Sequence, residues 1–288
     1  MKIGILGMGS IGQRHAKNLN DLGHEVLIHD ITFDSVREHV IKEADAMVIA
    51  TPTRCHFADL RDCLDAGKPT FVEKPIAANR QEYDELFDRL VAHDVFVGYN
   101  ARFHPCVIRI KEWLDDGVIG PPLWGSFVCA QYNAKPAYRR DGVILNWSHE
   151  IDLARHLLGP SEVFGAVVHI ENNLDDMADL FLVHGGKVRS AVHLNYLTSP
   201  QARGFQIIGM AGVISANLAD GFVERQGERR PIGQRTYFAP DAWDNSYIQE
   251  MWAFLDHVEG KPAAGAHGND GLAVLDLALA ARRMAGLP

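Results

Sequence analysis

Three glycines close to the amino terminus have a spacing that suits phosphate binding. Gly7, Gly9 and Gly12 form the pattern G-x-G-x-x-G in the segment GMGSIG, directly after the short apolar run KIGIL. The first glycine permits a tight turn, the second lets a pyrophosphate approach the backbone, and the third lets a helix pack closely on a strand. The N–H groups of Ser10 and Ile11 at the helix start then face the phosphates. The pattern therefore predicts a dinucleotide site.

An acidic residue follows at the distance expected for binding the ribose of a dinucleotide. Asp30 ends the apolar stretch EVLIHD, about twenty residues after the glycines. A carboxylate at this position binds the hydroxyls of the adenosine ribose and repels a 2′-phosphate. Asp30 therefore favours NAD over NADP as the cofactor.

A lysine stands where another apolar stretch ends. The run 69–72 reads as a buried strand, followed by Glu73, Lys74 and Pro75. Proline keeps Lys74 out of a helix, and the next helix begins near Asn79, so the lysine lies on a short loop. Ligands bind at this edge of a parallel sheet. Two interpretations follow, a lysine in a ligand site or an exposed lysine paired with Glu73.

The segment NWSHEIDLARHLLG carries several polar side chains with helical spacing. His149, Asp152 and His156 share one face of the predicted helix, and the apolar residues share another. Gly159 and Pro160 end it. The pattern alone indicates a solvated polar face.

The elements that position these residues alternate between strand and helix in the first third of the chain. This alternation is typical of a doubly wound parallel sheet of the Rossmann type. Only one helix fits between Asp30 and Asp45, so the wall around an adenine should be thin. The sequence predicts strands at 2–6, 25–30, 46–51, 69–72 and 95–98, and helices at 10–22, 34–42, 56–66 and 80–93.

The second part of the chain has a different pattern, in which strands follow one another directly. Such runs predict an α+β domain with a mostly antiparallel open sheet and helices on one face. We predict a first domain at 1–117 and a second at 118–288, with two late helices that cover the second sheet or reach back to the first domain. The predicted strands are 123–132, 162–170, 179–185, 188–196, 204–210 and 212–218.

The composition is that of an ordinary globular protein and excludes several classes. The 288 residues are 47% hydrophobic and carry a formal net charge of -9, which argues against nucleic-acid and anionic-membrane partners. The four cysteines lack CxxC spacing, so we expect neither a zinc site nor disulfides, and a reduced, cytoplasmic protein fits best. The histidines at 169, 184 and 193 lack metal-ligand spacing, and we expect no metal.

Motifs along nearly the whole chain resemble those of the Gfo/Idh/MocA family of oxidoreductases, named after glucose-fructose oxidoreductase and inositol dehydrogenase. They are GMGSIG, ATPT, AGKPTFVEKPIA, VGYNARFHP, GVILNWSHEIDLARHLLG and DNSYIQEMWAF. The resemblance implies that Lys74 lies beside the nicotinamide and the reacting hydroxyl, and that His149 is the acid or base. It also implies an open second sheet that mediates homodimers or homotetramers. The cofactor-binding residues predicted in this way are Gly7, Gly9, Ser10, Ile11, Gly12, Asp30, Thr51, Pro52, Thr53, His56, Glu73, Lys74, Asn100 and Arg102.

One position departs from the family pattern. Asn146 stands where family members usually carry an aspartate before the histidine, and an amide holds no charge to orient it. Asp152, about a turn away, is a candidate to restore part of that charge. The predicted catalytic residues are thus Lys74, His149, Asn146 and Asp152. The predicted substrate residues are Lys74, Arg102, Tyr132, Arg139, Trp147 and His149.

These observations lead to one main hypothesis and two alternatives. The main one is an NAD-dependent oxidoreductase that transfers a hydride between nicotinamide and a hydroxyl of a sugar, cyclitol or sugar derivative. The alternatives are a hydrolase or lyase of the same fold that keeps NAD bound, and a protein that binds the dinucleotide without chemistry.

Overall fold

The computed structural model describes residues 1–33, 35–90, 95–132, 141–171, 173–227, 230–239 and 241–287, and it divides into two compact units. The first unit consists of Met1–Asn100 and Tyr247–Asp276, and the second of Ala101–Ser246 and Leu277–Pro288. Each unit is assembled from two separate stretches of chain, whereas the predicted boundary at residue 117 gives each domain one continuous stretch. That functional division stays a prediction.

A six-stranded sheet forms the centre of the first unit. Its strand order is β14-β5-β4-β3-β1-β2, and every pair is parallel except β14 with β5. The strands β3, β4 and β5 are buried along their whole length, as expected for a sheet covered on both faces. The predicted doubly wound Rossmann-type sheet is confirmed. The strands are β1 (Lys2–Leu6), β2 (Glu25–His29), β3 (Ala46–Ile49), β4 (Thr70–Glu73), β5 (Val95–Gly98) and β14 (Ala266–His267).

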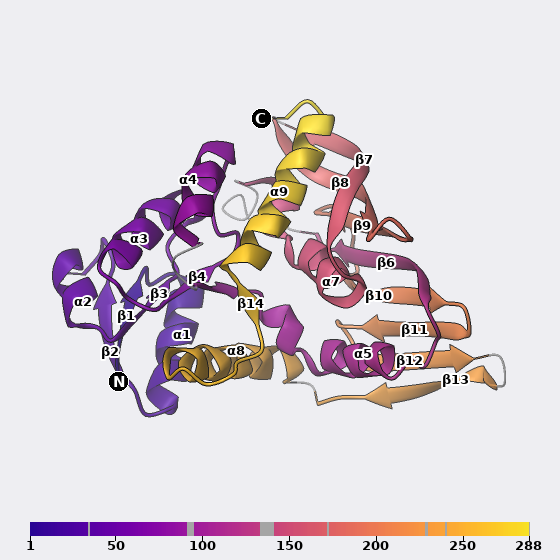
Figure 1. Cartoon of the computed structure of the whole chain (residues 1–288), viewed down its shortest axis with the longest axis horizontal. Helices are drawn as coiled ribbons and strands as arrows, with labels where there is room; N and C mark the ends of the chain where they lie inside the picture. The colour runs from indigo at the N-terminus through magenta and orange to yellow at the C-terminus, as the bar shows by residue number, and fades with distance from the viewer. Residues whose placement is uncertain are drawn as a thin grey trace. The chain divides into compact units, whose positions relative to one another are not determined.

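Helices cover both faces of this sheet. The helices α2, α3 and α4 lie on one face, and α1 with the later part of α8 lies on the other (Figure 1). On the second face the Phe254 ring of α8 packs against Phe71 and Phe96, with centroids 5.7 and 6.1 Å away. The bounds are α1 (Ser10–Asp21), α2 (Arg37–Glu43), α3 (Thr53–Asp65), α4 (Arg80–Leu90), α8 (Ala242–Val258) and α9 (Gly268–Met284).

Two local predictions in this unit are confirmed by the geometry. The helix α2 is the one helix between β2 and β3 among the described residues of that segment. The Asn79 side chain caps α4, because its Oδ1 accepts the Glu82 N–H at 3.1 Å while Glu82 Oε2 accepts the Ala78 N–H at 2.7 Å. The loop after Lys74 therefore ends at a fixed helix start.

The second unit is built on an eight-stranded sheet with the order β13-β12-β11-β10-β6-β9-β8-β7. Its pairs are antiparallel apart from β6 with β9, which is parallel, so the predicted mostly antiparallel sheet is confirmed. The strands β12 and β13 lie outside the predicted set. The bounds are β6 (Pro122–Ala130), β7 (Ser161–Glu171), β8 (Leu174–His184), β9 (Val188–Asn195), β10 (Ala202–Gly209), β11 (Gly212–Asn217), β12 (Phe222–Gly227) and β13 (Arg230–Tyr237).

Short helices pack on this sheet. The helix α5 (Pro105–Asp115) packs on β11 and β12, α6 (Gly142–Asn146) on β8, and α7 (His149–Leu158) on β6 and β9. A 3-10 turn, Asn100–Phe103, precedes α5. The late helices α8 and α9 each contribute residues to both units, so of the two predicted alternatives they do reach back to the first. Among the described residues, no helix combines the length and the apolar character needed to cross a membrane.

Candidate active site

The glycine loop between β1 and α1 has the close backbone contacts that only glycine allows. Gly7 has a φ of +92°, and a Cβ there would lie 2.7 Å from the Ala50 carbonyl oxygen and from the Thr51 nitrogen. A Cβ on Gly12 would collide with the Gly7 carbonyl oxygen. A Cβ on Gly9 would meet no atom within 4 Å, so the space beside this exposed glycine is open. The loop therefore leaves a surface where a phosphate can approach the backbone.

The start of α1 and the end of β2 meet at this loop. Gly9 is the N-cap of α1, and no side chain caps the first-turn N–H groups among the described residues. The Asp30 Oδ2 accepts the Met8 N–H at 2.7 Å, and its Oδ1 accepts from the N–H and the hydroxyl of Thr32 at 3.0 and 2.8 Å. These bonds, first of all the one from Met8, lower the pKa of Asp30 and keep it a carboxylate. The residues present fit a dinucleotide with its pyrophosphate on α1 and its ribose beside Asp30.

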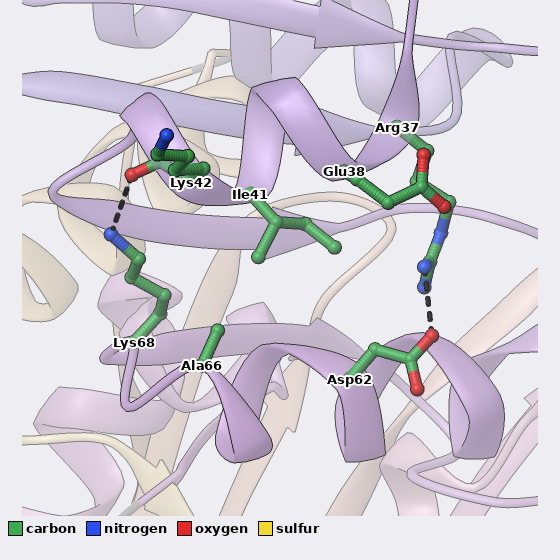
Figure 2. A pocket seen from close by; sticks show the side chains of 7 residues that line it. All are labelled: Arg37, Glu38, Ile41, Lys42, Asp62, Ala66 and Lys68. Atoms are coloured by element: carbon green, nitrogen blue, oxygen red, sulfur yellow. Dashed lines mark hydrogen bonds and ion pairs between the residues drawn. The ribbon is translucent and has the colours of Figure 1, made fainter.

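The loop after β3 is held by a chain of polar contacts. The Thr51 hydroxyl donates to Asp59 Oδ2 at 2.7 Å, and Arg37 of α2 donates from Nε and Nη2 to Asp59 Oδ1. Pro52 is the N-cap of α3 and Thr53 its first residue. Arg37 also pairs with Asp62 at 2.8 Å and lines a cavity of about 400 Å³ between α2 and α3 (Figure 2). None of the predicted site residues lines this cavity.

His56 lies behind that loop, buried at 1% exposure. Its Nδ1 is 2.7 Å from the Pro75 carbonyl oxygen, and its Nε2 is 2.8 Å from the Thr51 carbonyl oxygen. The ring thus connects the loop after β3 with the loop after β4. That His56 binds the cofactor stays a prediction. The structure shows its two contacts with backbone carbonyl oxygens.

Lys74 follows directly on β4, at the carboxyl edge of the parallel sheet. Its neighbour Glu73 is buried, with Oε1 2.8 Å from the Nε2 of the buried His15 and with Oε2 accepting the Lys74 N–H at 3.3 Å. His15 also lies edge-on to Phe71 at 5.2 Å. Glu73 is therefore a buried support of the loop, which differs from the exposed pairing that one interpretation of the sequence assumed.

The helix α7 has a polar face that is buried, so the expectation of a solvated face is wrong. Asp152 is 0% exposed and accepts two hydrogen bonds from Arg102, Nε to Oδ2 at 2.9 Å and Nη2 to Oδ1 at 2.6 Å. Glu150 is 1% exposed and pairs with Arg203 at 2.7 Å. His149, at 8% exposure, begins the same helix. Arginines from other segments neutralise both carboxylates, of which the helical spacing alone assigned Asp152 to solvent.

Asn146 ends α6, just before α7. Its Nδ2 donates to the Tyr196 hydroxyl at 2.6 Å, and that hydroxyl donates to the Gly142 carbonyl oxygen at 3.3 Å. Burial raises the pKa of Tyr196, so its hydroxyl keeps its proton. The Trp147 ring packs edge-on against Tyr196 at 4.6 Å. The segment that leads to His149 is thus fixed by neutral hydrogen bonds.

Comparison with known proteins decides the family. The model of the oxidoreductase family with an NAD-binding Rossmann fold (GFO_IDH_MocA) matches residues 27–101, and the model of the GFO/IDH/MocA C-terminal domain matches residues 107–215, together more than half of the chain. The chain belongs to the Gfo/Idh/MocA family. It is an oxidoreductase, and NAD is its cofactor.

Related proteins cover the chain from end to end. The myo-inositol 2-dehydrogenase of Thermotoga maritima is 27% identical over 98% of this chain and 96% of its own length. The inositol 2-dehydrogenase 1 of Saccharopolyspora erythraea is 28% identical over 98% and 93%. Among solved structures, levoglucosan dehydrogenase with NADH and levoglucosan has a TM-score of 0.85 at 18% identity, covering 99% of this chain and 97% of that one. This low identity supports the fold alone.

The remaining predicted residues of this Gfo/Idh/MocA protein fall into three groups. Asn100 is buried at the start of the 3-10 turn, and Arg102 two residues later binds Asp152. Tyr132 is 59% exposed, and its N–H donates to the Thr198 carbonyl oxygen at 2.6 Å. Arg139 lies outside the described residues. The structure thus brings two of the predicted site residues, Arg102 and Asp152, into direct contact.

Sequence reasoning missed His15 and the partner Arg203. His15 stands three residues after Gly12, a helical spacing that places it on the face of α1 toward the sheet, which was a usable signal. Arg203 is 53 residues away from Glu150 in the chain, so spacing gave no indication of that pair. Among the described residues there is also no group of three or more side chains suited to hold a metal ion.

Proposed function

We propose that this protein is a dehydrogenase that oxidises a hydroxyl-bearing carbon of a sugar, cyclitol or sugar derivative with NAD. The observation that carries the proposal is the position of Lys74 on the same carboxyl edge of the parallel sheet as the glycine loop and Asp30. The edge thus combines residues that fit a dinucleotide with an ammonium group suited to a substrate oxygen.

The residues of this chain have separate chemical tasks in the proposal. Bound NAD supplies an acceptor for the hydride that leaves the carbon. Lys74 donates to the hydroxyl oxygen and stabilises it as it loses its proton, and His149 takes up that proton. Asn146 orients the segment before His149 through its hydrogen bond to the Tyr196 hydroxyl. As an amide, its side chain neither takes up a proton nor supplies charge.

The substrate class is supported by the names of the relatives. Several curated relatives that align over nearly the whole chain are inositol 2-dehydrogenases. We propose the same class of substrate for this protein, a polyhydroxylated small molecule. The family membership and the position of Lys74 both suit the oxidation of a hydroxyl on such a molecule.

We also propose that copies of this chain assemble as homodimers or homotetramers through the open face of the eight-stranded sheet. The helices α5, α6 and α7 pack on the sheet, and the alternate side chains of β8, Met177, Phe181 and Val183, are left half-buried. The edge strand β7 exposes Phe164 and Val167 at 55% and 66%. Light scattering of the full chain tests this, and a mass of one protomer at all concentrations would contradict it.

The activity is tested by screening sugars, cyclitols and sugar derivatives for NADH absorbance with wild type and a Lys74→Met variant. Loss of a positioned acid–base group lowers turnover by about two to four powers of ten. We expect that loss in Lys74→Met, with NAD affinity retained in calorimetry, because Lys74 acts on the substrate oxygen. The matched control is Lys17→Met, since Lys17 is exposed on α1 beside Asp21. Wild-type turnover in a folded Lys74→Met protein would refute the proposed function.

A further inference from the structure

The contacts of His56 are unusual because both ring nitrogens face the same kind of group. The Pro75 carbonyl oxygen lies 2.7 Å from Nδ1, and the Thr51 carbonyl oxygen lies 2.8 Å from Nε2. The residue is 1% exposed, so water does not stand in for either partner. Both distances are those of good hydrogen bonds.

A carbonyl oxygen accepts hydrogen bonds and never donates one. A neutral imidazole has one N–H donor and one bare nitrogen, so one of the two contacts would set a lone pair against a carbonyl oxygen. The doubly protonated ring donates from both nitrogens, and such charge-assisted bonds are the shorter and stronger kind. The geometry therefore calls for two donors on His56.

The two carbonyl groups belong to loops that follow neighbouring parallel strands. Thr51 follows β3, and its hydroxyl is already fixed by Asp59. Pro75 follows β4 and is bonded through its nitrogen to Lys74, the residue that the proposed function places on the substrate oxygen. A ring that holds both carbonyls sets the position of one loop against the other.

We infer that His56 is a positioning residue which, protonated on both ring nitrogens, fixes the Lys74 loop to the Thr51 loop. The functional half of this inference rests on the proposed role of Lys74. The protonation half does not, because it follows from the two carbonyl contacts alone.

Charged groups surround this bridge on both sides. On the Thr51 side Asp59 accepts the threonine hydroxyl and pairs with Arg37 at 2.7 Å. On the Pro75 side Glu73 is held by His15. Lys74 itself adjoins Pro75. A singly protonated His56 ring could donate to only one of the two carbonyl oxygens, so it would hold only one of the two loops.

His104 provides an internal comparison for the protonation state. It is also fully buried, but its Nδ1 accepts the Cys106 N–H at 3.2 Å, which requires a bare nitrogen. Burial, together with the charge of Arg203, lowers the pKa of His104 to about 4. Two buried histidines of one chain are thus expected in opposite states near neutral pH.

The direct test is ¹⁵N NMR of the histidine rings in the full chain labelled with ¹⁵N-histidine, at about pH 8, where an ordinary histidine is neutral. Ring signals are assigned through the backbone and checked with His56→Gln. We expect both His56 nitrogens to have the shifts of N–H groups, and His104 to have one N–H and one bare nitrogen. A neutral His56 ring at this pH would overturn the inference, whatever the activity.

The functional test compares turnover and KM of His56→Gln and His56→Asn with wild type. Misplacing a catalytic group by about 1 Å costs about a hundredfold in rate. We expect a fall of about that size in turnover with a smaller change in KM. His39→Gln, an exposed histidine of α2, should match wild type. If His56 is doubly protonated but its variants keep wild-type turnover, the positioning role fails; if only Lys74→Met keeps activity, the proposed function fails instead.

Discussion

The carboxyl edge of the first sheet and the helix α7 hold their polar side chains in different ways. At the sheet edge, Asp30 and His56 bind backbone N–H and C=O groups of nearby loops. In α7, Glu150 and Asp152 bind guanidinium groups of Arg203 and Arg102, which come from segments about fifty residues away in the chain. The first arrangement depends on hydrogen bonds to the backbone of the loops themselves. The second buries whole charges, so it fails when one partner is removed.

The largest effect is expected where a buried ion pair of α7 is broken. Arg203→Met leaves Glu150 buried without its 2.7 Å partner, and removing one member of such a pair costs about 3–5 kcal/mol of the free energy of unfolding. Urea unfolding followed by circular dichroism measures it. The control is the double variant Glu150→Gln with Arg203→Met, which should recover much of the loss. A loss below about 1 kcal/mol would place this pair with ordinary surface ion pairs.

A second prediction concerns His104, which lies beside the same Arg203. The lowered pKa of about 4 means that the unfolded chain binds a proton more readily than the folded one. The stabilisation is therefore complete above about pH 6.5 and is lost as the pH falls toward about 4, a change on the order of 3 kcal/mol. His104→Asn keeps an N-cap for α5 and has no titrating ring.

Unfolding measured across this pH range should show a steeper loss of stability in wild type than in His104→Asn. Equal slopes in wild type and His104→Asn would mean that the His104 ring titrates alike in the folded and the unfolded chain. His104 could then no longer serve as the neutral buried histidine with which His56 is compared.

The smallest effect is expected at the sheet edge, for Asp30. Wild type should bind NAD at least tenfold tighter than NADP, about 1.4 kcal/mol, because the carboxylate repels a 2′-phosphate. Asp30→Asn keeps the shape and removes the charge, so this preference should shrink toward equality in calorimetric titrations. Asp21→Asn, an exposed acid on α1, should leave it unchanged. Equal affinities in wild type would remove Asp30 from the ribose site.

The sequence predicted the sheet edge well because its determinants are local. The glycine spacing and the capped start of α4 each depend on residues a few positions apart, and the acid at the end of β2 follows the glycines by one strand–helix–strand unit. The buried face of α7 was predicted wrongly for the opposite reason, since helical spacing reports which residues share a face and not what covers it. The strands β12 and β13 were not predicted, because their sequences FVERQG and RPIGQRTY lack a regular alternation of apolar and polar residues.

At the candidate site, too, the sequence predicted the position of a residue better than its surroundings. The position of Lys74 at the end of β4 followed from an apolar run and a proline. Its surroundings did not, because His15 and His56 reach the loop from α1 and α3. The predicted functions of Lys74, His149, Asn146 and Asp152 rest on family resemblance and remain predictions, of which Lys74→Met examines the first.

The path of the chain through α8 has a consequence for exchanging parts of this protein. Phe254, far along the sequence, packs on Phe71 and Phe96 of the first sheet. A fragment that stops after the Rossmann-type segment would keep the glycine loop and Asp30 yet present those two rings to water, and exposed aromatic surface promotes aggregation. Recombination between relatives therefore has to carry 247–276 along with 1–100. The first compact unit is therefore built from two pieces of chain that are far apart in the sequence.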